Sequence, residues 1–312
     1  MHKPSILFMG TPEFAVPSLK ILIDHRMPLA GVVTQPDRPR GRGRQLAPPP
    51  VKILAEAHGL SVLQPERIRD EAFLQVFRDL APELVVVAAF GQILPGEMIS
   101  RPPLGCINVH PSLLPKYREA APIQRSLING DETTGMTIMS MDEGVDSGDI
   151  LLQEPVPILP EENFGSLHDR LAEIGARMLY RTIEMIIDQS VRPIRQDHAK
   201  ATPAPRIRKE DCVIDWSRSV KDVLSLIRGL SPDPGAYTFL NGKKLKIYAA
   251  RGEASPSPPA PGTVSNPAAG EPAVAAADGF VYPEDIQLEN KNRMSVRDFL
   301  RGYRITPGTT MG

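Results

Sequence analysis

Gly105-Cys-Ile-Asn-Val-His-Pro-Ser-Leu-Leu-Pro-Lys-Tyr-Arg118 contains the strand around which the rest of the chain can be arranged. The pattern predicts a buried strand over residues 106–110, because Pro111 cannot donate a hydrogen bond to a neighbouring strand. Side chains alternate along a strand, so Asn108 and His110 share one face. Strands buried on both faces are normally apolar throughout. An amide and an imidazole near the carboxyl end of such a strand therefore indicate a ligand site, since open α/β sheets bind ligands at that edge.

The segments that precede this strand predict a parallel sheet. Apolar runs at residues 5–9, 31–35 and 84–90 are typical of buried strands, and a helix that begins at Pro17 separates the first two. A β-α-β order at the start of a chain favours a doubly wound sheet. The first turn, Gly10-Thr-Pro-Glu-Phe, lacks the glycines of the dinucleotide fingerprint, so we do not expect NAD to bind there.

Carboxylates follow on a loop punctuated by glycines, Met141-Asp-Glu-Gly-Val-Asp-Ser-Gly148, between strands expected over residues 135–141 and 149–157. Taken alone, an Asn-x-His pair is usually a hydrogen-bonded strand end, and an Asp-Gly loop is usually a turn. If Asp146 met His110, however, the group could stabilise negative charge and move a proton. The loop is therefore a candidate partner for the strand.

The two segments Asn108-Val-His-Pro-Ser-Leu-Leu-Pro-Lys-Tyr-Arg118 and Asp142-Glu-Gly-Val-Asp-Ser-Gly-Asp149 closely resemble the signature of the folate-dependent formyltransferases. The resemblance implies 10-formyltetrahydrofolate as cosubstrate, and the sequence itself contains no cluster of metal-ligand type, so no metal is expected. The resemblance also implies that Asn108 and His110 stabilise the oxyanion formed during formyl transfer, while Asp146 assists proton transfer. The positions that match the folate-binding part of the family are Phe90, Gly91, Ile93, Leu94, Ser112, Leu113, Leu114 and Pro115.

One position departs from the resembled pattern. The family continues with Gly-Ala-Ala-Pro, whereas this chain has Glu119-Ala-Ala-Pro122. If the backbone there has a positive φ, glutamate costs roughly 1 kcal/mol or more relative to glycine. Glu119 would also bring a carboxylate near the site, so its effect on activity is left open by the sequence.

A basic segment follows the second strand, Pro36-Asp-Arg-Pro-Arg-Gly-Arg-Gly-Arg-Gln-Leu-Ala-Pro-Pro-Pro50. A mobile surface loop with solvated charges is one interpretation, but long loops often carry function and guanidinium groups suit phosphates. The segment and the earlier Gly10-Thr-Pro-Glu-Phe-Ala-Val-Pro17 resemble the branch of the family that acts on methionyl-initiator tRNA, in which the insertion reaches the acceptor arm. The arginines expected to contact tRNA are Arg38, Arg40, Arg42, Arg44, Arg206 and Arg208.

The expected fold class is α/β, with a doubly wound, mostly parallel Rossmann-like sheet followed by a small, OB-like β-barrel. We expect a formyltransferase catalytic domain over residues 1–189, closed by an amphipathic helix over residues 166–188. A basic linker rich in proline covers residues 190–208. Short strands separated by Gly and Pro then predict a C-terminal tRNA-binding barrel over residues 209–312.

The composition adds several exclusions. A net charge of −1 gives no overall electrostatic case for nucleic acid or membrane, so local charge must provide any such contact. Cys106 and Cys212 lie far apart in the sequence and lack the spacing of metal ligands. We expect both to be reduced thiols. The first apolar run is too short for a signal peptide or a membrane span. We therefore expect a cytoplasmic monomer that binds neither metal nor membrane.

Two other functions remain open at this point. A related enzyme could formylate a sugar-nucleotide amine or hydrolyse formyl-folate, but the basic loop and the C-terminal barrel argue against it. A tRNA- or folate-binding module could also have lost catalysis through Glu119, although Asn108, His110 and Asp146 are all present. An assay that offers charged initiator tRNA and uncharged small amines distinguishes the three.

Overall fold

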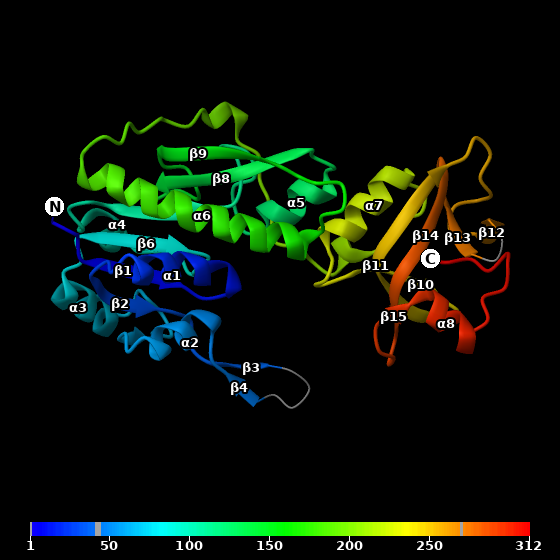
Figure 1. The fold of residues 1–312 in the computed structure, drawn as a ribbon, viewed down its shortest axis with the longest axis horizontal. Helices are drawn as coiled ribbons and strands as arrows, with labels where there is room; N and C mark the ends of the chain where they lie inside the picture. The colour runs from blue at the N-terminus through cyan, green and yellow to red at the C-terminus, as the bar shows by residue number, and fades with distance from the viewer. Residues whose placement is uncertain (1, 41–44, 269–270) are drawn as a thin grey trace. The chain divides into compact units, whose positions relative to one another are not determined.

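The computed structural model of the protein describes residues 2–40, 45–268 and 271–312. The chain forms two compact units, each built from three segments (Figure 1). Unit 1 comprises Met1–Glu119, Thr134–Pro157 and His168–Pro203, and unit 2 comprises Ala120–Thr133, Ile158–Leu167 and Ala204–Gly312. The chain therefore enters unit 2 directly after Glu119, well before the predicted linker, and returns to unit 1 twice.

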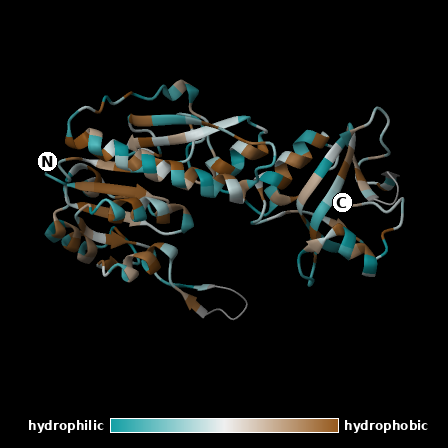
Figure 2. Ribbon diagram, in the orientation of Figure 1, coloured by the Kyte–Doolittle hydropathy of each residue, from teal (hydrophilic) through white to brown (hydrophobic). Residues whose placement is uncertain are grey.

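Unit 1 is organised around a seven-stranded sheet with the order β5-β2-β1-β6-β7-β8-β9. The neighbours from β5 to β7 pair in parallel, and β8 pairs antiparallel with β7. The predicted doubly wound, mostly parallel sheet is thus confirmed. Strands β1 and β6 are buried along their whole length and appear brown in Figure 2. The strands are β1 (Ile6–Gly10), β2 (Leu29–Val33), β5 (Val62–Leu63), β6 (Leu84–Ala88), β7 (Cys106–His110), β8 (Thr133–Ser140) and β9 (Ile150–Pro157).

Helices pack on this sheet through apolar faces. In one core cluster Phe73 and Phe77 of α3 and Met98 of α4 lie among Met9 of β1 and Val87 of β6. Burial of such side chains contributes roughly 1.5–3 kcal/mol each, which fixes the helices against the strands. The α-helices are α1 (Val16–Asp24), α2 (Pro50–Ala57), α3 (Glu71–Leu80), α4 (Gly96–Ser100) and α6 (Phe164–Ile187).

The basic segment after β2 contains a short antiparallel pair, β3 (Arg38–Arg40) with β4 (Gln45–Ala47). At its base, Nζ of Lys52 donates to both carboxylate oxygens of Asp37 at 2.9 Å and to Oε1 of Gln64 at 2.8 Å. Nε2 of Gln64 also donates to Asp37. The hydrogen bonds from Gln64 and Lys52 hold the pKa of the Asp37 carboxyl below its usual value. This network anchors the hairpin to α2 and β5.

Unit 2 contains a six-stranded antiparallel sheet with the order β10-β11-β14-β13-β12, and β15 pairs with β14. Isolated bridges connect Leu240 of β10 with Met311, and Thr263 before β12 with Thr310. The C-terminal residues therefore join the two edges of the sheet, as closure of a barrel requires. The strands are β10 (Ala236–Leu240), β11 (Lys243–Ala254), β12 (Val264–Ala268), β13 (Glu271–Ala276), β14 (Gly279–Leu288) and β15 (Met294–Ser295).

The α-helices that lie wholly in the described part of unit 2 are α5 (Pro122–Ile128), α7 (Val220–Gly229) and α8 (Val296–Gly302). Helix α5 packs against α7 so closely that a Cβ on Gly229 would come within 2.6 Å of Ile128. Trp216 is buried in the core of this unit and donates from Nε1 to Oγ1 of Thr238 at 3.1 Å. Unit 2 therefore has a core of its own, separate from that of unit 1.

Candidate active site

Strand β7 presents Asn108 and His110 at the carboxyl end of the sheet. Its bounds, Cys106–His110, are those predicted from the sequence. The His110 side chain is only 4% exposed, and Asn108 is partly buried. Strand β6 on one side and β8 on the other hold β7 in register, so both side chains have a rigid support.

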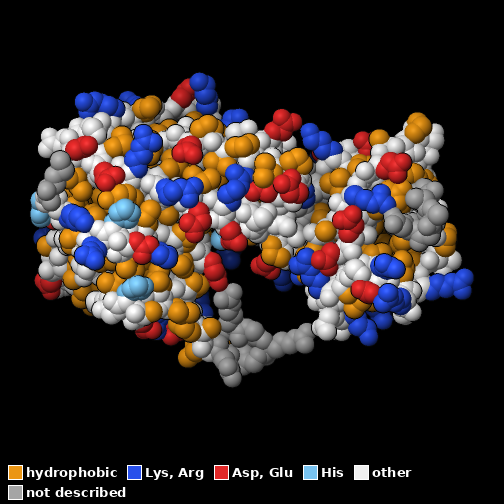
Figure 3. All heavy atoms as spheres, in the orientation of Figure 1, with side chains coloured by type: hydrophobic (Ala, Val, Ile, Leu, Met, Phe, Trp, Pro, Cys, Tyr) orange, Lys and Arg blue, Asp and Glu red, His pale blue; other side chains and the backbone are white. Residues whose placement is uncertain are grey.

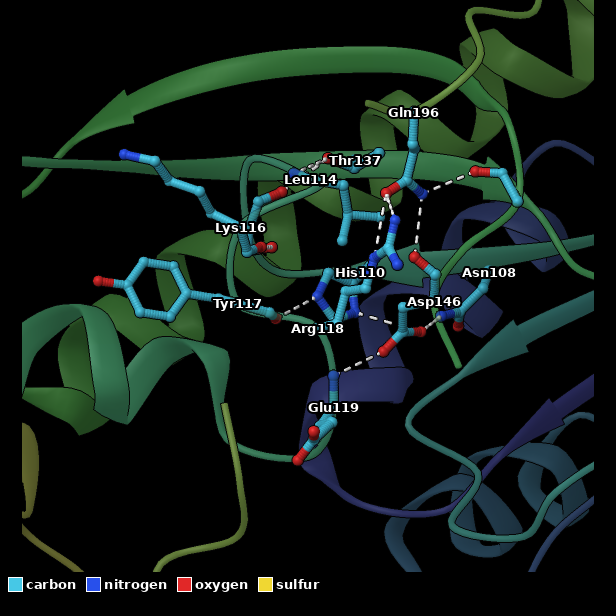
Figure 4. A network of polar contacts seen from close by, with 12 residues as sticks. Asn108, His110, Leu114, Lys116, Tyr117, Arg118, Glu119, Thr137, Asp146 and Gln196 are labelled. Carbon is cyan, nitrogen blue, oxygen red and sulfur yellow. Dashed lines mark hydrogen bonds and ion pairs between the residues drawn. The ribbon is translucent and has the colours of Figure 1, made fainter. Parts of the chain in front are cut away.

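The Asp146 carboxylate meets both of these side chains (Figure 4). Its Oδ1 accepts from Nδ2 of Asn108 at 3.4 Å and lies 3.6 Å from Nδ1 of His110. Its Oδ2 accepts from the backbone N–H of Glu119 at 2.8 Å. The structure thus brings together the three residues that the sequence singled out, 38 positions apart in the case of Asn108 and Asp146.

The His110 ring lies between two hydrogen-bond acceptors. Nε2 lies 2.9 Å from the backbone oxygen of Tyr117, which can only accept, so this nitrogen donates. The opposite nitrogen, Nδ1, faces the Asp146 carboxylate. The orientation of the ring is therefore fixed from both sides. The Tyr117 carbonyl was missed by sequence reasoning because a backbone group leaves no residue signal.

Glu119 occupies the left-handed region, with φ of 91°. The position therefore does have the backbone conformation that favours glycine. Its N–H still reaches Asp146, because that hydrogen bond needs only the backbone. The Glu119 side chain is exposed, and its carboxylate points away from Asp146 in Figure 4.

The loop that carries Asp146 is held by local contacts. Oδ1 of Asp142 accepts from the backbone N–H of Gly144 at 3.0 Å and from the Ser147 hydroxyl at 2.7 Å. Gly148 is required by close approach, since a Cβ there would collide with the backbone oxygen of Ser140. Asp142 therefore shapes the turn, and Asp146 is the carboxylate that faces β7.

The loop after β6 carries the first group of predicted folate-binding residues. Phe90 and Leu94 are 2% and 5% exposed and pack into a core cluster. Ile93 is 70% exposed, and Gly91 has φ of 88°. On the neighbouring Asp146 loop, Val145 is 57% exposed. Of this group, Ile93 is the side chain free to contact a ligand.

The loop after β7 carries the second group. Ser112 is fully buried, and its hydroxyl donates to the Lys116 oxygen at 2.7 Å. Leu114 is buried in a small cluster with Met139 and Ile150. Leu113 and Pro115 are partly exposed. Ser112 and Leu114 therefore shape the loop, while Leu113 and Pro115 remain available at its surface.

A cavity of about 510 Å³ opens in unit 1 beyond the carboxyl ends of β1, β2 and β6. Among its lining residues, Thr11 and Gln35 donate from Oγ1 and Nε2 to the backbone oxygen of Phe90, at 3.1 and 3.3 Å. The position agrees with the edge at which doubly wound sheets bind ligands. The lining residues include Thr11, Glu13, Gln35, Arg38, Pro39, Pro49, Phe90 and Gly91.

The predicted phosphate-binding arginines fall on two segments. Arg38 and Arg40 lie on β3, and Arg38 reaches Oε1 of Gln35 at 3.4 Å. Arg206 and Arg208 are exposed on unit 2. Two of the predicted residues, Arg42 and Arg44, lie outside the described part of the chain.

A second cavity, also of about 510 Å³, lies in unit 2 beside α7. Glu210, Asp211, Asp215 and Asp222 line it, so its charge is unsuited to phosphate. Acidic and basic side chains intermingle on the face of each unit shown in Figure 3. Contact with nucleic acid therefore requires local basic segments, as the net charge of −1 already indicated.

Neither cysteine is suited to covalent catalysis. Both are free and buried, and burial raises the pKa of the Cys106 and Cys212 thiols. The thiolate is the nucleophilic form, so these groups are inert. Within the described ranges, no group of three or more His, Cys, Asp and Glu side chains is arranged to hold a metal ion. The described helices also include none with the length and apolar character needed to cross a bilayer.

Comparison with known proteins shows the family. Residues 3–183 match the formyl transferase family, and residues 206–304 match the formyl transferase C-terminal domain. The methionyl-tRNA formyltransferase of Syntrophus aciditrophicus (strain SB) is 55% identical over 312 residues, which cover 100% of both chains. That of Geotalea daltonii (strain DSM 22248 / JCM 15807 / FRC-32) is 49% identical over 310 residues, 98% of each chain.

A solved structure shares the fold at low sequence identity. HypX from Aquifex aeolicus in complex with tetrahydrofolic acid has a TM-score of 0.65 and 16% identity, and the match covers 99% of this chain but 51% of that one. An identity this low carries the fold alone. Membership of the family is established by the full-length relatives and by the two matched domains. On that basis, the chain belongs to the formyl transferase family, among the methionyl-tRNA formyltransferases.

Proposed function

We propose that this chain transfers a formyl group from 10-formyltetrahydrofolate to the α-amine of methionyl-initiator tRNA for translation initiation, with Asn108, His110 and Asp146 as its catalytic residues. The observation that carries the proposal is the contact of the Asp146 carboxylate with both side chains at the carboxyl end of β7. A positioned amide, imidazole and carboxylate are the groups that acyl transfer to an amine requires.

Asn108 and His110 supply hydrogen-bond donors from one face of β7. As the amine attacks, negative charge grows on the formyl oxygen, and donors already fixed in place stabilise it without reorganisation. The His110 ring is held from both sides, by the Tyr117 oxygen at Nε2 and by Asp146 at Nδ1. An imidazolium held in this way contributes positive charge beside the developing oxyanion.

Asp146 accepts the proton that the attacking amine must lose, directly or through a water molecule, and a proton passes to N10 of the folate as its bond to the formyl carbon breaks. Its carboxylate also balances the charge of His110 at 3.6 Å. The N–H of Glu119 fixes Oδ2 and so sets the direction of the carboxylate. Proton transfer of this kind typically contributes about 10²–10⁴-fold to a rate.

The residues near the site suit a flat, partly apolar formyl donor. Exposed side chains of Ile93 and Val145 lie on the two loops that flank β7, and Leu113 and Pro115 follow it. A Cβ on Gly96 would stand 3.4 Å from Oε1 of Glu143, so these two loops are neighbours. The folate supplies a formyl group on nitrogen, and these side chains would hold its ring. HypX, which shares this fold, has been solved in complex with tetrahydrofolic acid, which supports a folate as the ligand but none of the individual side chains.

The tRNA would contact the arginines of the basic segment after β2 and those at the start of the last segment of unit 2. Arg38, Arg40, Arg42 and Arg44 provide guanidinium groups within a short stretch. Such groups bind phosphate through paired N–H donors. The exposed Arg206 and Arg208 would add contacts from unit 2.

The catalytic assignment is tested by Asn108→Ala and His110→Ala. Each variant should lose about 10²–10³-fold in turnover with charged initiator tRNA and the formyl donor, while remaining folded by circular dichroism. His58→Ala is the matched control, because His58 is exposed beyond the end of α2 and should leave turnover unchanged. Undiminished turnover of the Asn108 and His110 variants would overturn the assignment.

Substrate choice is tested in the same assay with uncharged small amines and a sugar-nucleotide amine. Charged tRNA should be formylated and the small amines should not. Arg42→Ala should raise the KM for tRNA and leave the KM for the formyl donor unchanged. An unchanged KM for tRNA at physiological salt would exclude Arg42 from the recognition surface.

A further inference from the structure

Residues 194–202 form a strap that crosses the candidate active site within unit 1. At one end, Ile194 exchanges two backbone hydrogen bonds of 2.8 Å with Ile150 at the start of β9. At the other end, Thr202 accepts from the backbone N–H of Arg118 at its carbonyl and from that of Tyr117 at its hydroxyl, both at 2.9 Å. The strap is therefore fixed on both sides of the site.

Gln196, near the middle of the strap, is 4% exposed and uses its whole amide (Figure 4). Nε2 donates to the backbone oxygens of Asp146 at 2.9 Å and Gly148 at 2.7 Å. Oε1 accepts from Nη2 and Nε of Arg118 at 2.7 and 3.3 Å. A primary amide has two N–H donors and two acceptor lone pairs, so each is occupied.

These contacts hold the backbone of the loop at Asp146 itself and at Gly148, where a small movement would displace the Asp146 carboxylate. Asp146 is a non-glycine residue with φ of 48°, a conformation that the surrounding structure must impose. Its carboxylate lies at 3.4 and 3.6 Å from its partners on β7, so a small shift of the backbone separates them. Without Gln196, the carbonyls of Asp146 and Gly148 would lose their buried donor, and the loop would move to find another.

We propose that Gln196 is a positioning residue, whose two N–H donors hold the Asp146 loop so that the carboxylate faces Asn108 and His110. This inference rests on the proposed catalytic role of Asp146. Gln196 itself contacts the backbone of the loop and the Arg118 side chain, so it acts on the reaction through Asp146. Because glutamine is neutral, it fixes the loop without adding a charge beside the His110–Asp146 pair.

Two variants separate the two halves of the amide. Gln196→Met keeps the length of the side chain and removes every hydrogen bond. Gln196→Glu keeps an acceptor for Arg118 but removes both donors to the loop. If the donors matter, both variants should lose about 10–100-fold in kcat, since displacement of a catalytic group by 1 Å can cost about 100-fold. The KM values for tRNA and formyl donor should stay within about threefold, because binding contacts are unchanged.

Gln75→Met is the matched control, since Gln75 is exposed on α3, where its Nε2 donates to Asp79 at 2.8 Å and its Oε1 accepts from Arg78 at 3.4 Å. It should retain the kcat of the unaltered chain. Melting temperatures of all variants are recorded, and kinetics are measured where each is folded. Gln196→Glu carries the comparison alone if Gln196→Met does not fold.

A double-mutant cycle with Asp146→Asn provides the decisive readout. If Gln196 acts through Asp146, Gln196→Met should have little further effect on kcat once Asp146 is already Asn. Equal losses of kcat in both backgrounds, or wild-type kcat in Gln196→Glu, would overturn the positioning role. Full activity of Asp146→Asn alone would instead overturn the proposed function. The two failures are therefore distinguishable.

Discussion

Replacement of Glu119 by glycine should make unit 1 more stable, because Glu119 has φ of 91°. A side chain in this region costs about 1–2 kcal/mol through contact of its Cβ with the backbone. Glycine removes that cost but gains freedom in the unfolded chain, which returns roughly 0.4–1 kcal/mol. The net gain is about 1 kcal/mol, which raises the melting temperature of a domain of ~150–250 residues by roughly 2–4 °C.

The assay can isolate unit 1. Trp216 is the only tryptophan of the chain and lies in the core of unit 2, so its fluorescence follows that unit alone. Calorimetry and far-ultraviolet circular dichroism follow both units. Glu119→Gly should shift the transition that is silent in fluorescence and leave the Trp216 transition where it was.

Glu119→Ala is the matched control, because alanine removes the carboxylate but keeps the Cβ that causes the strain. It should leave the melting temperature almost unchanged. Equal stability of the Gly and Ala variants would refute the strain argument, and an equal gain in both would assign the effect to the carboxylate. The backbone N–H of residue 119, which donates to Asp146, is present in all three proteins.

Three other changes test different parts of the structure. Gly148→Ala should lower the free energy of unfolding by about 1–3 kcal/mol in urea, because its Cβ would collide with the backbone oxygen of Ser140. It should also lower kcat. Unchanged stability would contradict the close approach of these two segments. The pKa of Asp37 lies below the ordinary aspartate value of 3.8, so its contribution to stability is present above that pH and is lost as the pH falls through the lowered pKa. Asp37→Asn should therefore lower the urea midpoint at pH 7 and approach wild type in strong acid, whereas a constant difference would argue against the carboxylate. Arg206→Ala and Arg208→Ala should each reduce the slope of log affinity for tRNA against log salt by roughly 0.7–0.9, and an unchanged slope would remove the residue from the contact.

The strands of unit 1 could be predicted because their physical signal is local. Cys106–His110 begins after a glycine and ends at a proline, and its apolar residues alternate with the Asn–His pair. Leu84–Ala88 is apolar throughout and is buried throughout. The basic hairpin could not be predicted in this way. The composition of Arg38–Arg40 is typical of a loop, and the segment forms a strand because it pairs with Gln45–Ala47.

The site was predictable where side chains of unusual chemistry stand at short spacing, as Asn108 and His110 do. Sequence patterns do not show which way the side chain of a loop residue points. The predicted folate-binding group therefore contains Ser112, Leu114 and Phe90 beside Ile93, although the first three are buried. Gln196 was missed for another reason. It lies among prolines and basic residues that indicate a linker, and its partners are backbone oxygens of a loop far away in the sequence.

The interleaving of the two units has a consequence for synthesis on the ribosome. Helix α5 (Pro122–Ile128) is translated inside the run of segments that builds unit 1, yet it packs against α7 (Val220–Gly229), which is made much later. The nascent chain must therefore carry an apolar helix without its partner until the final third emerges. A fragment that starts at residue 204 would meet the reverse difficulty, because the surface of α7 that α5 covers would then be exposed.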